Sequence, residues 1–257
     1  MAGGRAAPKL ARMSQSALRI AGLQKSFDKP VITGLDLEVA AGELYALLGP
    51  NGAGKTTTLR MATGLTRPDA GSIHIFGIDA LADPVAAKAV TAWLPDEPML
   101  YDRLTPAEYL GFVAGLWRIP PAEAAPEAER LLKWLELWDE RDTRCEGFSR
   151  GMKQKVALAG ALIHKPRLLI LDEPLTGLDA NMARAVKDAL RAAVDEGATI
   201  IVTTHILEVA ERMADRIGII GGGKLLAEGT LEELRAKAGS DEMTLEDAFI
   251  ALTRAPQ

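Results

Sequence analysis

The sequence comprises 257 residues, of which 48% are hydrophobic and 25% are charged, with a formal net charge of -5. This composition is typical of a globular chain that buries a sizeable core. The acidic balance gives no electrostatic reason to expect nucleic acid as a partner. No apolar run approaches the roughly 18–20 residues that span a bilayer, so the chain is not expected to form a membrane pore itself.

The first residues and the cysteine content both predict a cytosolic setting. Residues 1–16 are expected to form a flexible N-terminal tail, because the segment is rich in Ala and Gly and has no continuous apolar stretch like that of a signal peptide. Cys145 is the single cysteine, which excludes a disulfide framework and favours a reducing compartment.

An antiparallel β layer is predicted near the N-terminus. Apolar and polar residues alternate from Thr33 to Val39, which is the period of a half-buried strand. Residues 18–23 and 72–76 are expected to be further strands of the same layer.

Three short apolar runs without alternation, at residues 44–48, 168–171 and 199–202, predict strands that are buried on both faces. Each run ends in polar residues: the glycine-rich loop from Gly49, the pair Asp172 and Glu173, and residues 203–205. Ligands of open parallel sheets bind beyond the carboxyl ends of the strands. We therefore expect the three segments to converge on one site.

The loop from Gly49 to Thr56 matches the pattern G-x-x-x-x-G-K-[ST] in full. It follows a buried strand and opens a helix, which is the context of a phosphate-binding loop. Lys55 is expected to reach the β- and γ-phosphates of a nucleotide, and the Thr56 hydroxyl to bind Mg²⁺. The predicted nucleotide-binding residues of this segment are Gly49, Pro50, Asn51, Gly52, Ala53, Gly54, Lys55, Thr56 and Thr57.

A small helical region is predicted from Thr105 to Trp138. Thr105 and Pro106 form a good helix start, with Glu108 as the partner in a capping box. Further along, apolar side chains recur at helical spacing, which indicates core packing rather than a ligand role: Leu131, Trp134, Leu135 and Trp138.

Asp172 and Glu173 follow an apolar strand directly, which favours a role at a nucleotide site over a surface location. A carboxylate at the position of Asp172 can hold Mg²⁺ opposite the phosphate loop. Glu173 would face the γ-phosphate, where it can polarise the attacking water. Beyond this region, residues 224–228 predict a hairpin strand, and two short helices are expected from Thr230 and Thr244.

Five motifs in this order resemble the ATP-binding subunits of ABC transporters: the phosphate loop and residues 148–154, 168–173, 177–179 and 204–205. The resemblance runs from about Leu18 to Thr253. It implies an α/β P-loop NTPase fold with a RecA-like core, an N-terminal antiparallel β layer and an inserted helical subdomain. The implied divisions are an ATPase domain over 17–230, with its helical subdomain at about 97–150, and a C-terminal helical extension over 231–257.

The resemblance also implies roles for residues outside the phosphate loop. Ser149 and Gly151 correspond to the signature loop, which contacts the γ-phosphate bound on a second subunit. Ser149 also stands at an expected helix start, where free N–H groups favour an anion. Asp179 corresponds to an aspartate that crosses the dimer interface, and His205 to a histidine that touches the γ-phosphate.

Phe27 resembles the aromatic residue that stacks on adenine, with packing inside the β layer as the alternative. Two positions depart from the family pattern. Arg150 and Met152 replace a glycine and the glutamine of the signature loop, and Asp96 stands where the family has a glutamine. A carboxylate at Asp96 can still reach Mg²⁺ directly or through water.

The resemblance therefore implies an ATPase that uses ATP and Mg²⁺, with two nucleotides held between two such subunits in a homodimer or heterodimer. The implied catalytic residues are Lys55, Glu173 and His205, and the implied metal ligands are Thr56, Asp172 and Asp96. The other implied partner is a transmembrane permease, which places the chain at the cytoplasmic face of the cell membrane as a peripheral subunit.

Export is favoured over import, because residues 94–98, the variant signature loop and the segment from Thr244 to Phe249 resemble exporter subunits of the ABC-2 type. An importer subunit is one alternative. A soluble ATPase that acts on ribosomes or DNA is another, although such members carry a second ATPase domain, coiled coils or zinc modules, and the sequence predicts none of these.

Overall fold

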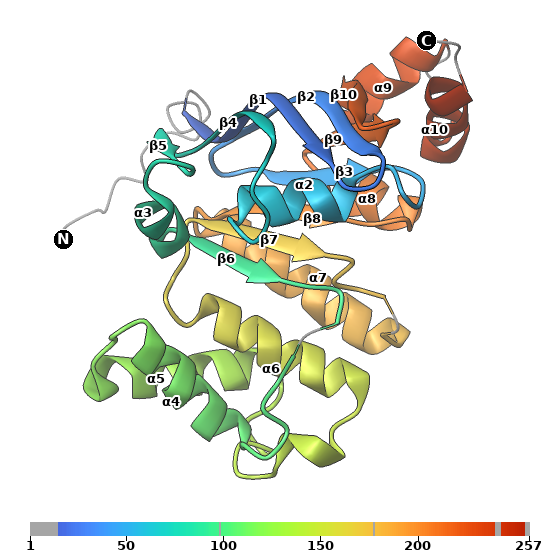
Figure 1. Cartoon of the computed structure of the whole chain (residues 1–257). Coiled ribbons are helices and arrows are strands. Elements are labelled where there is room, and N and C mark those ends of the chain that lie inside the picture. The colour runs from blue at the N-terminus through green and yellow to red at the C-terminus, as the bar shows by residue number, and fades with distance from the viewer. Residues whose placement is uncertain (1–14, 98, 177, 240–242, 255–257) are drawn as a thin grey trace, which may run out of the picture.

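The computed structural model describes residues 15–97, 99–176, 178–239 and 243–254 (Figure 1). Two sheets form one part of the molecule, and helices α4 (Pro106–Leu116), α5 (Pro121–Trp134) and α6 (Arg150–Leu162) gather below them in this view. Most of the predicted tail, Gly177 of the 177–179 motif, and residues 255–257 of the predicted extension lie outside the described residues.

The predicted antiparallel layer is confirmed as a four-stranded sheet of order β2-β1-β4-β5. Leu18 pairs with Val39 on one side and with Ile75 on the other. The strands are longer than the alternation suggested, and they are β1 (Ser16–Ser26), β2 (Pro30–Ala40), β4 (Ala70–Ile75) and β5 (Ile78–Asp79).

A six-stranded sheet of order β10-β9-β3-β8-β7-β6 carries the three buried strands that the apolar runs predicted. All neighbouring strands are parallel except β10, which forms the predicted hairpin with β9. The sequence did not lead us to expect β6 and β9. The strands are β3 (Leu44–Leu48), β6 (Thr91–Leu94), β7 (Leu168–Asp172), β8 (Thr199–Thr203), β9 (Arg216–Gly221) and β10 (Lys224–Gly229).

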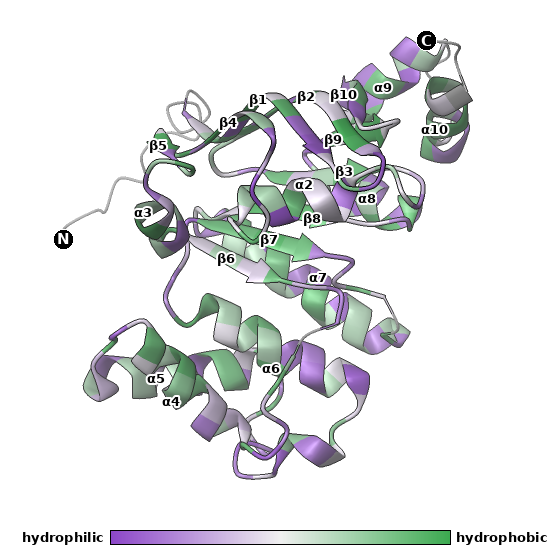
Figure 2. Ribbon diagram, viewed as in Figure 1, coloured by the Kyte–Doolittle hydropathy of each residue, from purple (hydrophilic) through white to green (hydrophobic). Residues whose placement is uncertain are grey.

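The central strands are hydrophobic on both sides because each side faces a different core (Figure 2). In β3, Tyr45 and Leu47 belong to the core between the two sheets, which α2 (Lys55–Ala62) also lines. Leu44 and Leu48 point to the opposite core, which extends into the helical region. This double burial explains why the strand shows no alternation.

The helical region contains α4 (Pro106–Leu116) and α5 (Pro121–Trp134), as predicted. Thr105 forms the expected capping box with Glu108, with N···O distances of 2.9 and 3.2 Å. Leu131 and Leu135 are buried, which confirms their expected core packing. Helix α6 (Arg150–Leu162) packs against α4, α5 and β6, so it connects the helical region to the sheet.

Of the remaining helices, α3, α7 and α8 lie beside the sheets, and α9 and α10 form the C-terminal end of the chain (Figure 1). Two of them, α9 and α10, begin after Thr230 and Thr244 as predicted. Of the helices in the described ranges, none is both long and apolar enough to cross a bilayer. The remaining bounds are α3 (Pro84–Ala89), α7 (Ala180–Asp195), α8 (Leu207–Met213), α9 (Leu231–Ala238) and α10 (Leu245–Arg254).

Candidate active site

The expected convergence of polar segments follows from the sheet topology. Strands β3, β8, β7 and β6 are parallel neighbours in that order. Their carboxyl ends therefore share one edge of the sheet. The phosphate loop follows β3, Asp96 follows β6, Asp172 ends β7, and His205 follows β8. This edge is the candidate active site.

The phosphate loop uses its glycines where other side chains would not fit. Gly54 has φ 105°, and a Cβ there would lie 2.4 Å from Ile32 Cδ1. A Cβ on Gly49 would lie 2.5 Å from the carbonyl oxygen of Ile220. The helix α2 begins directly after Gly54 without a side-chain cap, so its first N–H groups are available to an anion.

Lys55 is almost fully buried beside this loop. Its Nζ donates hydrogen bonds to the carbonyl oxygens of Gly49, at 2.6 Å, and Pro50, at 3.2 Å. Burial lowers the pKa of Lys55, while the charges of Glu173 and Asp172 act in the opposite direction. The phosphate oxygens of a nucleotide could replace the two carbonyls as acceptors.

The other loop residues differ in exposure. Thr56 is exposed and Thr57 half-buried, so the Thr56 hydroxyl is free to meet a ligand. Pro50 and Asn51 are also exposed, whereas Ala53 is buried, and its N–H donates to Pro50 O at 3.2 Å. This pattern of exposed and buried residues agrees with a loop whose backbone N–H groups surround an anion.

Asp172 and Glu173 are held by the same residue of the neighbouring strand. Asp172 is buried and accepts a hydrogen bond of 2.5 Å from Thr203 Oγ1. The Glu173 N–H donates to Thr203 Oγ1 at 3.1 Å and to Thr203 O at 3.2 Å. Glu173 has φ 49°, a left-handed conformation that costs a non-glycine residue about 1–3 kcal/mol. These two bonds hold the backbone of Glu173 in place against that cost.

The carboxylate of Glu173 contacts His205 directly. His205 Nδ1 donates to Glu173 Oε2 at 2.9 Å, and the His205 N–H approaches the same oxygen at 3.4 Å. Thr176 Oγ1 also donates to Oε2, at 3.4 Å. No described residue donates a hydrogen bond to the other oxygen, Oε1. The side chain is therefore oriented by one oxygen and can accept a hydrogen bond from water at the other.

Asp96 lies at the same edge and contacts the start of α6. Its Oδ1 accepts a hydrogen bond from Arg150 Nη2 at 3.2 Å. The pKa of Asp96 is raised, chiefly by desolvation and also by the negative charges of Asp172 and Glu173, while Arg150 acts to lower it. The negative charges of Asp172 and Glu173 at the end of β7 therefore act on Asp96.

The predicted signature residues and Asp179 lie at helix starts. Ser149 caps α6 by accepting a hydrogen bond from Met152 N at 3.3 Å, and Asp179 caps α7 through Met182 N at 2.9 Å. A Cβ on Gly151 would lie 2.0 Å from Met182 Sδ, so a glycine permits close packing between the two helix starts. Among the described residues, no hydrogen bond joins Ser149 or Gly151 to the phosphate loop.

Phe27 lies between β1 and β2 with 62% of its surface exposed. The alternative that it packs inside the β layer is therefore wrong, and most of the residue is accessible to a ligand. The ammonium group of Lys25 is 5.4 Å from the ring centroid.

The oxygen groups at this edge fit Mg²⁺, which prefers oxygen ligands. Asp172, Asp96 and the Thr56 hydroxyl provide protein oxygens, and the start of α2, which has no side-chain cap, offers N–H groups to an anion. The described residues contain no cluster of three or more His, Cys, Asp or Glu side chains arranged to hold a metal. A cation at this site would thus need further oxygens, such as those of phosphate and water.

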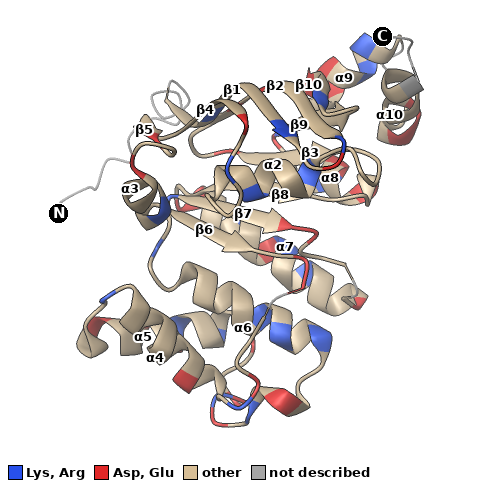
Figure 3. Cartoon of the chain, viewed as in Figure 1, with Lys and Arg blue, Asp and Glu red and all other residues tan. Residues whose placement is uncertain are grey.

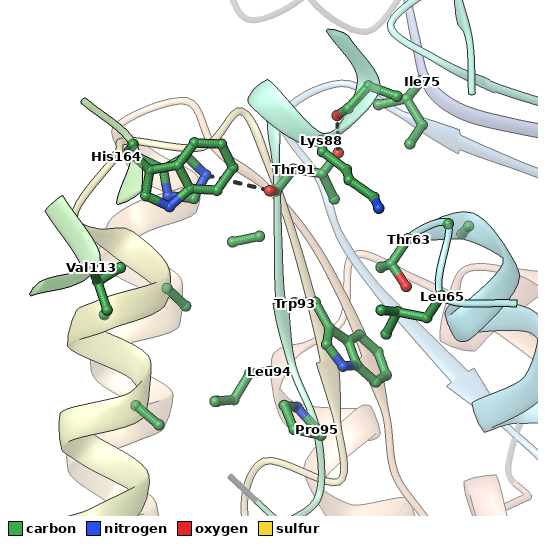
Figure 4. A pocket seen from close by; sticks show the side chains of 18 of the residues that line it. Thr63, Leu65, Ile75, Lys88, Thr91, Trp93, Leu94, Pro95, Val113 and His164 are labelled. Atoms are coloured by element: carbon green, nitrogen blue, oxygen red, sulfur yellow. Dashed lines mark hydrogen bonds between the residues drawn. The ribbon is translucent and has the colours of Figure 1, made fainter. Parts of the chain in front are cut away.

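A second feature, which sequence reasoning missed, is a groove of about 490 Å³ between the sheet and the helical region (Figure 4). It is mainly apolar, and its walls include Leu65, Trp93 and Val113. His164 donates from Nε2 to Thr91 O at 3.3 Å, and its ring stacks on Trp117 at 4.0 Å. No local pattern reveals the groove, because its walls come from separate segments: the end of α2, helices α3, α4 and α6, and strand β6.

Comparisons with known proteins agree with this geometry. The fold and the glycine loop define a P-loop ATPase. Residues 32–176 match the family described as ABC transporter. The chain is 38% identical to the daunorubicin resistance ATP-binding protein DrrA3 of Streptomyces coeruleorubidus over 90% of this chain and 73% of that protein. It is 41% identical to the Nod factor export ATP-binding protein I of Rhizobium meliloti (strain 1021) over 83% of this chain and 64% of that protein.

A solved structure of an ATP-binding subunit of an ABC transporter superposes with a TM-score of 0.86 at 33% identity, covering 92% of this chain and 99% of that one. The chain therefore belongs to the ATP-binding subunits of the ABC transporter family. It is an ATP-binding protein of the class that couples ATP hydrolysis to transport.

Proposed function

We propose that the chain drives export across the cytoplasmic membrane by hydrolysing ATP together with a second ATPase subunit and a separate transmembrane partner. The observation that carries this proposal is the convergence of Lys55, Asp172, Glu173 and His205 on one edge of the sheet. The names of the two curated relatives, a drug-resistance protein and a Nod factor export protein, support export.

In the proposed reaction, the phosphate loop binds the triphosphate and Lys55 neutralises its charge. Mg²⁺ would be held by Thr56, Asp172 and Asp96 and would stabilise charge on the phosphate oxygens. Glu173 accepts a hydrogen bond from the attacking water through Oε1, since His205 occupies its other oxygen. His205, which contacts Glu173, would also interact with the γ-phosphate.

The second subunit would complete the site. Ser149 and Gly151 start a helix whose N–H groups and positive end favour an anion, yet no hydrogen bond joins them to their own phosphate loop among the described residues. We infer that they contact the γ-phosphate bound by the partner subunit, with Asp179 at the interface between the two copies. Hydrolysis would then remove the group that bridges them.

Phe27 would bind the adenine ring. Its exposure and its place before β2 support this, because Ile32 of β2 lies directly against Gly54 of the phosphate loop. Stacking on an exposed aromatic face requires no specific hydrogen bond.

The groove beside β6 is the proposed contact with the transmembrane partner. Met99, Leu65 and Trp117 line it with 92%, 53% and 38% of their surfaces exposed, which is an unusual amount of apolar surface to leave in water. The groove lies between α4 and β6, and the loop after β6 carries Asp96. A partner bound there would sense changes at the nucleotide site. The chain would then be a peripheral protein at the cytoplasmic face.

The test is purification of the chain with its native partner from detergent-treated membranes. We expect a protein with several membrane-spanning helices and no solute-binding protein in the complex. Trp117→Glu should prevent copurification while nucleotide binding persists, and Leu116→Glu, at an exposed position of the C-terminal end of α4 that does not line the groove, is the matched control. Stable recovery with ribosomes or DNA, and never with membranes, would contradict the proposal.

A further inference from the structure

Asp96 and Arg150, the two charged residues at which the chain departs from the expected motifs, are in contact. Arg150 Nη2 lies 3.2 Å from Asp96 Oδ1. Asp96 belongs to the loop after β6, and Arg150 is the first residue of α6. The ion pair therefore joins the edge of the sheet to the helix start that carries Ser149 and Gly151.

The surroundings of Asp96 explain why a cation is favourable there. Asp172 and Glu173 add negative charge to the same region, so three carboxylates share one edge of the sheet. Lys55 offsets part of this charge from the side of the phosphate loop. Arg150 supplies a positive charge from the side of α6, and Figure 3 shows that basic residues gather in the first turns of this helix.

The ion pair between Asp96 and Arg150 is weak enough for another cation to displace Arg150. Both side chains are 47% exposed, and exposed ion pairs typically change an equilibrium constant by only about two- to fivefold. A divalent cation carries twice the charge of a guanidinium, so at the same distance its attraction to the carboxylates is stronger. Arg150 engages Oδ1 of Asp96, so a cation that also binds this carboxylate either shares it with the guanidinium or displaces the guanidinium from it.

We propose that Arg150 is a built-in counter-ion for Asp96, displaced when Mg²⁺ enters with the nucleotide, so that loading the site releases the first turn of α6. This inference rests on the proposed function, in which Mg²⁺ and ATP occupy this edge. Arg150 acts here as a positioning residue: it holds the start of α6 against the empty site and frees it when the site is filled.

The same helix offers a matched control. Lys153 is three residues further along α6 and pairs with Asp102 at 2.9 Å. Asp102 follows the loop that carries Asp96 and has no contact with Asp172 or Glu173 among the hydrogen bonds and ion pairs of the described residues. Lys153→Gln therefore removes the same charge from the same helix without removing a counter-ion from the site.

The first measurement is a Mg²⁺ titration of fluorescent, non-hydrolysable ATP-analogue binding to the full chain. Arg150→Gln should lower the Mg²⁺ concentration for half-maximal binding by about two- to fivefold, since a competing cation is removed. Lys153→Gln should not shift it. Asp96→Asn should raise it, and in that background Arg150→Gln should have no further effect.

The second measurement is amide hydrogen exchange with Mg²⁺-ADP, which lacks the γ-phosphate proposed to bridge two subunits. Exchange in the first turn of α6 should rise when Mg²⁺-ADP binds the wild type. In Arg150→Gln it should be high already, before the nucleotide is added.

Three results would each overturn the inference while leaving the proposed function intact. The first is an equal shift of the Mg²⁺ midpoint in Arg150→Gln and Lys153→Gln. The second is a full Arg150→Gln effect in the Asp96→Asn background. The third is amide exchange in the first turn of α6 that is unaffected by Mg²⁺-ADP. Failure of the wild type to bind the nucleotide at any Mg²⁺ concentration would instead reject the proposed function.

Discussion

Glu173 Oε2 accepts a hydrogen bond of 2.9 Å from His205 Nδ1, which joins the ends of two neighbouring strands across the candidate active site. The side chain of Glu173 is mostly buried and that of His205 is mostly exposed. The histidine therefore reaches over the acid from the solvent side. A bound phosphate that attracts His205 would change the contacts of Glu173, so the two residues should act as one unit.

Replacing Glu173 by Gln should separate nucleotide binding from hydrolysis. The amide keeps the size of the side chain but loses the basicity that activates water, which is worth about a hundredfold or more in rate. We expect normal ATP affinity, hydrolysis lowered by at least that factor, and a closed dimer that accumulates with ATP in size-exclusion chromatography. Glu97→Gln, an exposed acid at the same edge, is the control. Normal turnover by Glu173→Gln would remove Glu173 as the base.

Lys55→Ala should weaken the binding of ATP. A hydrogen bond to a charged group contributes about 1.5–3 kcal/mol, so the dissociation constant should rise by about tenfold to a hundredfold. The measurement is isothermal titration calorimetry with circular dichroism as the check on folding. Lys224→Ala, an exposed lysine of β10, should bind like the wild type. Equal affinity of Lys55→Ala and wild type would place the triphosphate elsewhere.

Ser149→Asp should abolish hydrolysis without unfolding α6. Aspartate caps helices as well as serine does, but its charge repels the triphosphate of the partner subunit. Mixing Ser149→Asp with Lys55→Ala should then restore part of the activity. In a mixed dimer, one site combines the intact Lys55 of one copy with the intact Ser149 of the other. If the mixture stays as inactive as its components, the two residues do not serve a shared site.

Hydrolysis by the wild type should also fall on dilution, because the site needs two copies. The rate per molecule, measured over a range of chain concentrations, should drop below the dimer dissociation constant. A rate per molecule that is independent of concentration, together with an active Ser149→Asp variant, would show that a single copy is sufficient.

The folded state should lose stability on acidification partly through His164. Burial lowers the pKa of His164 from its ordinary value of 6.5. At a pH between the lowered pKa of the folded chain and the ordinary pKa of the unfolded chain, the unfolded chain binds more protons. The free energy of unfolding therefore falls as the pH drops through about 6.5. His164→Gln should flatten this part of the pH profile, although it costs about 1 kcal/mol at all pH values through the lost stacking on Trp117. The measurement is urea unfolding from pH 8 to pH 5, and an unchanged slope would contradict it.

Much of the fold could be predicted from local patterns. The run from Leu44 to Leu48 has no alternation because both faces of the strand are buried, and the capping box at Thr105 marked the start of α4. Strands β6 and β9 were missed. β6 has only four residues, and β9 is interrupted by Gly218, where a Cβ would meet the ring of Tyr45, so neither gives a clear periodic signal.

The sequence by itself determined the phosphate loop, the acidic end of β7 and the order of the motifs, because these depend on neighbours in the chain: a glycine pattern, a buried run and a helix start. Only the tertiary structure decided that His205 contacts Glu173, that Arg150 pairs with Asp96, that Phe27 is exposed and that an apolar groove lies beside β6. The physical reason is that these contacts join residues far apart in sequence, and their geometry depends on how the strands are ordered and how α6 packs against the sheet. The secondary-structure preferences of individual segments do not determine that arrangement.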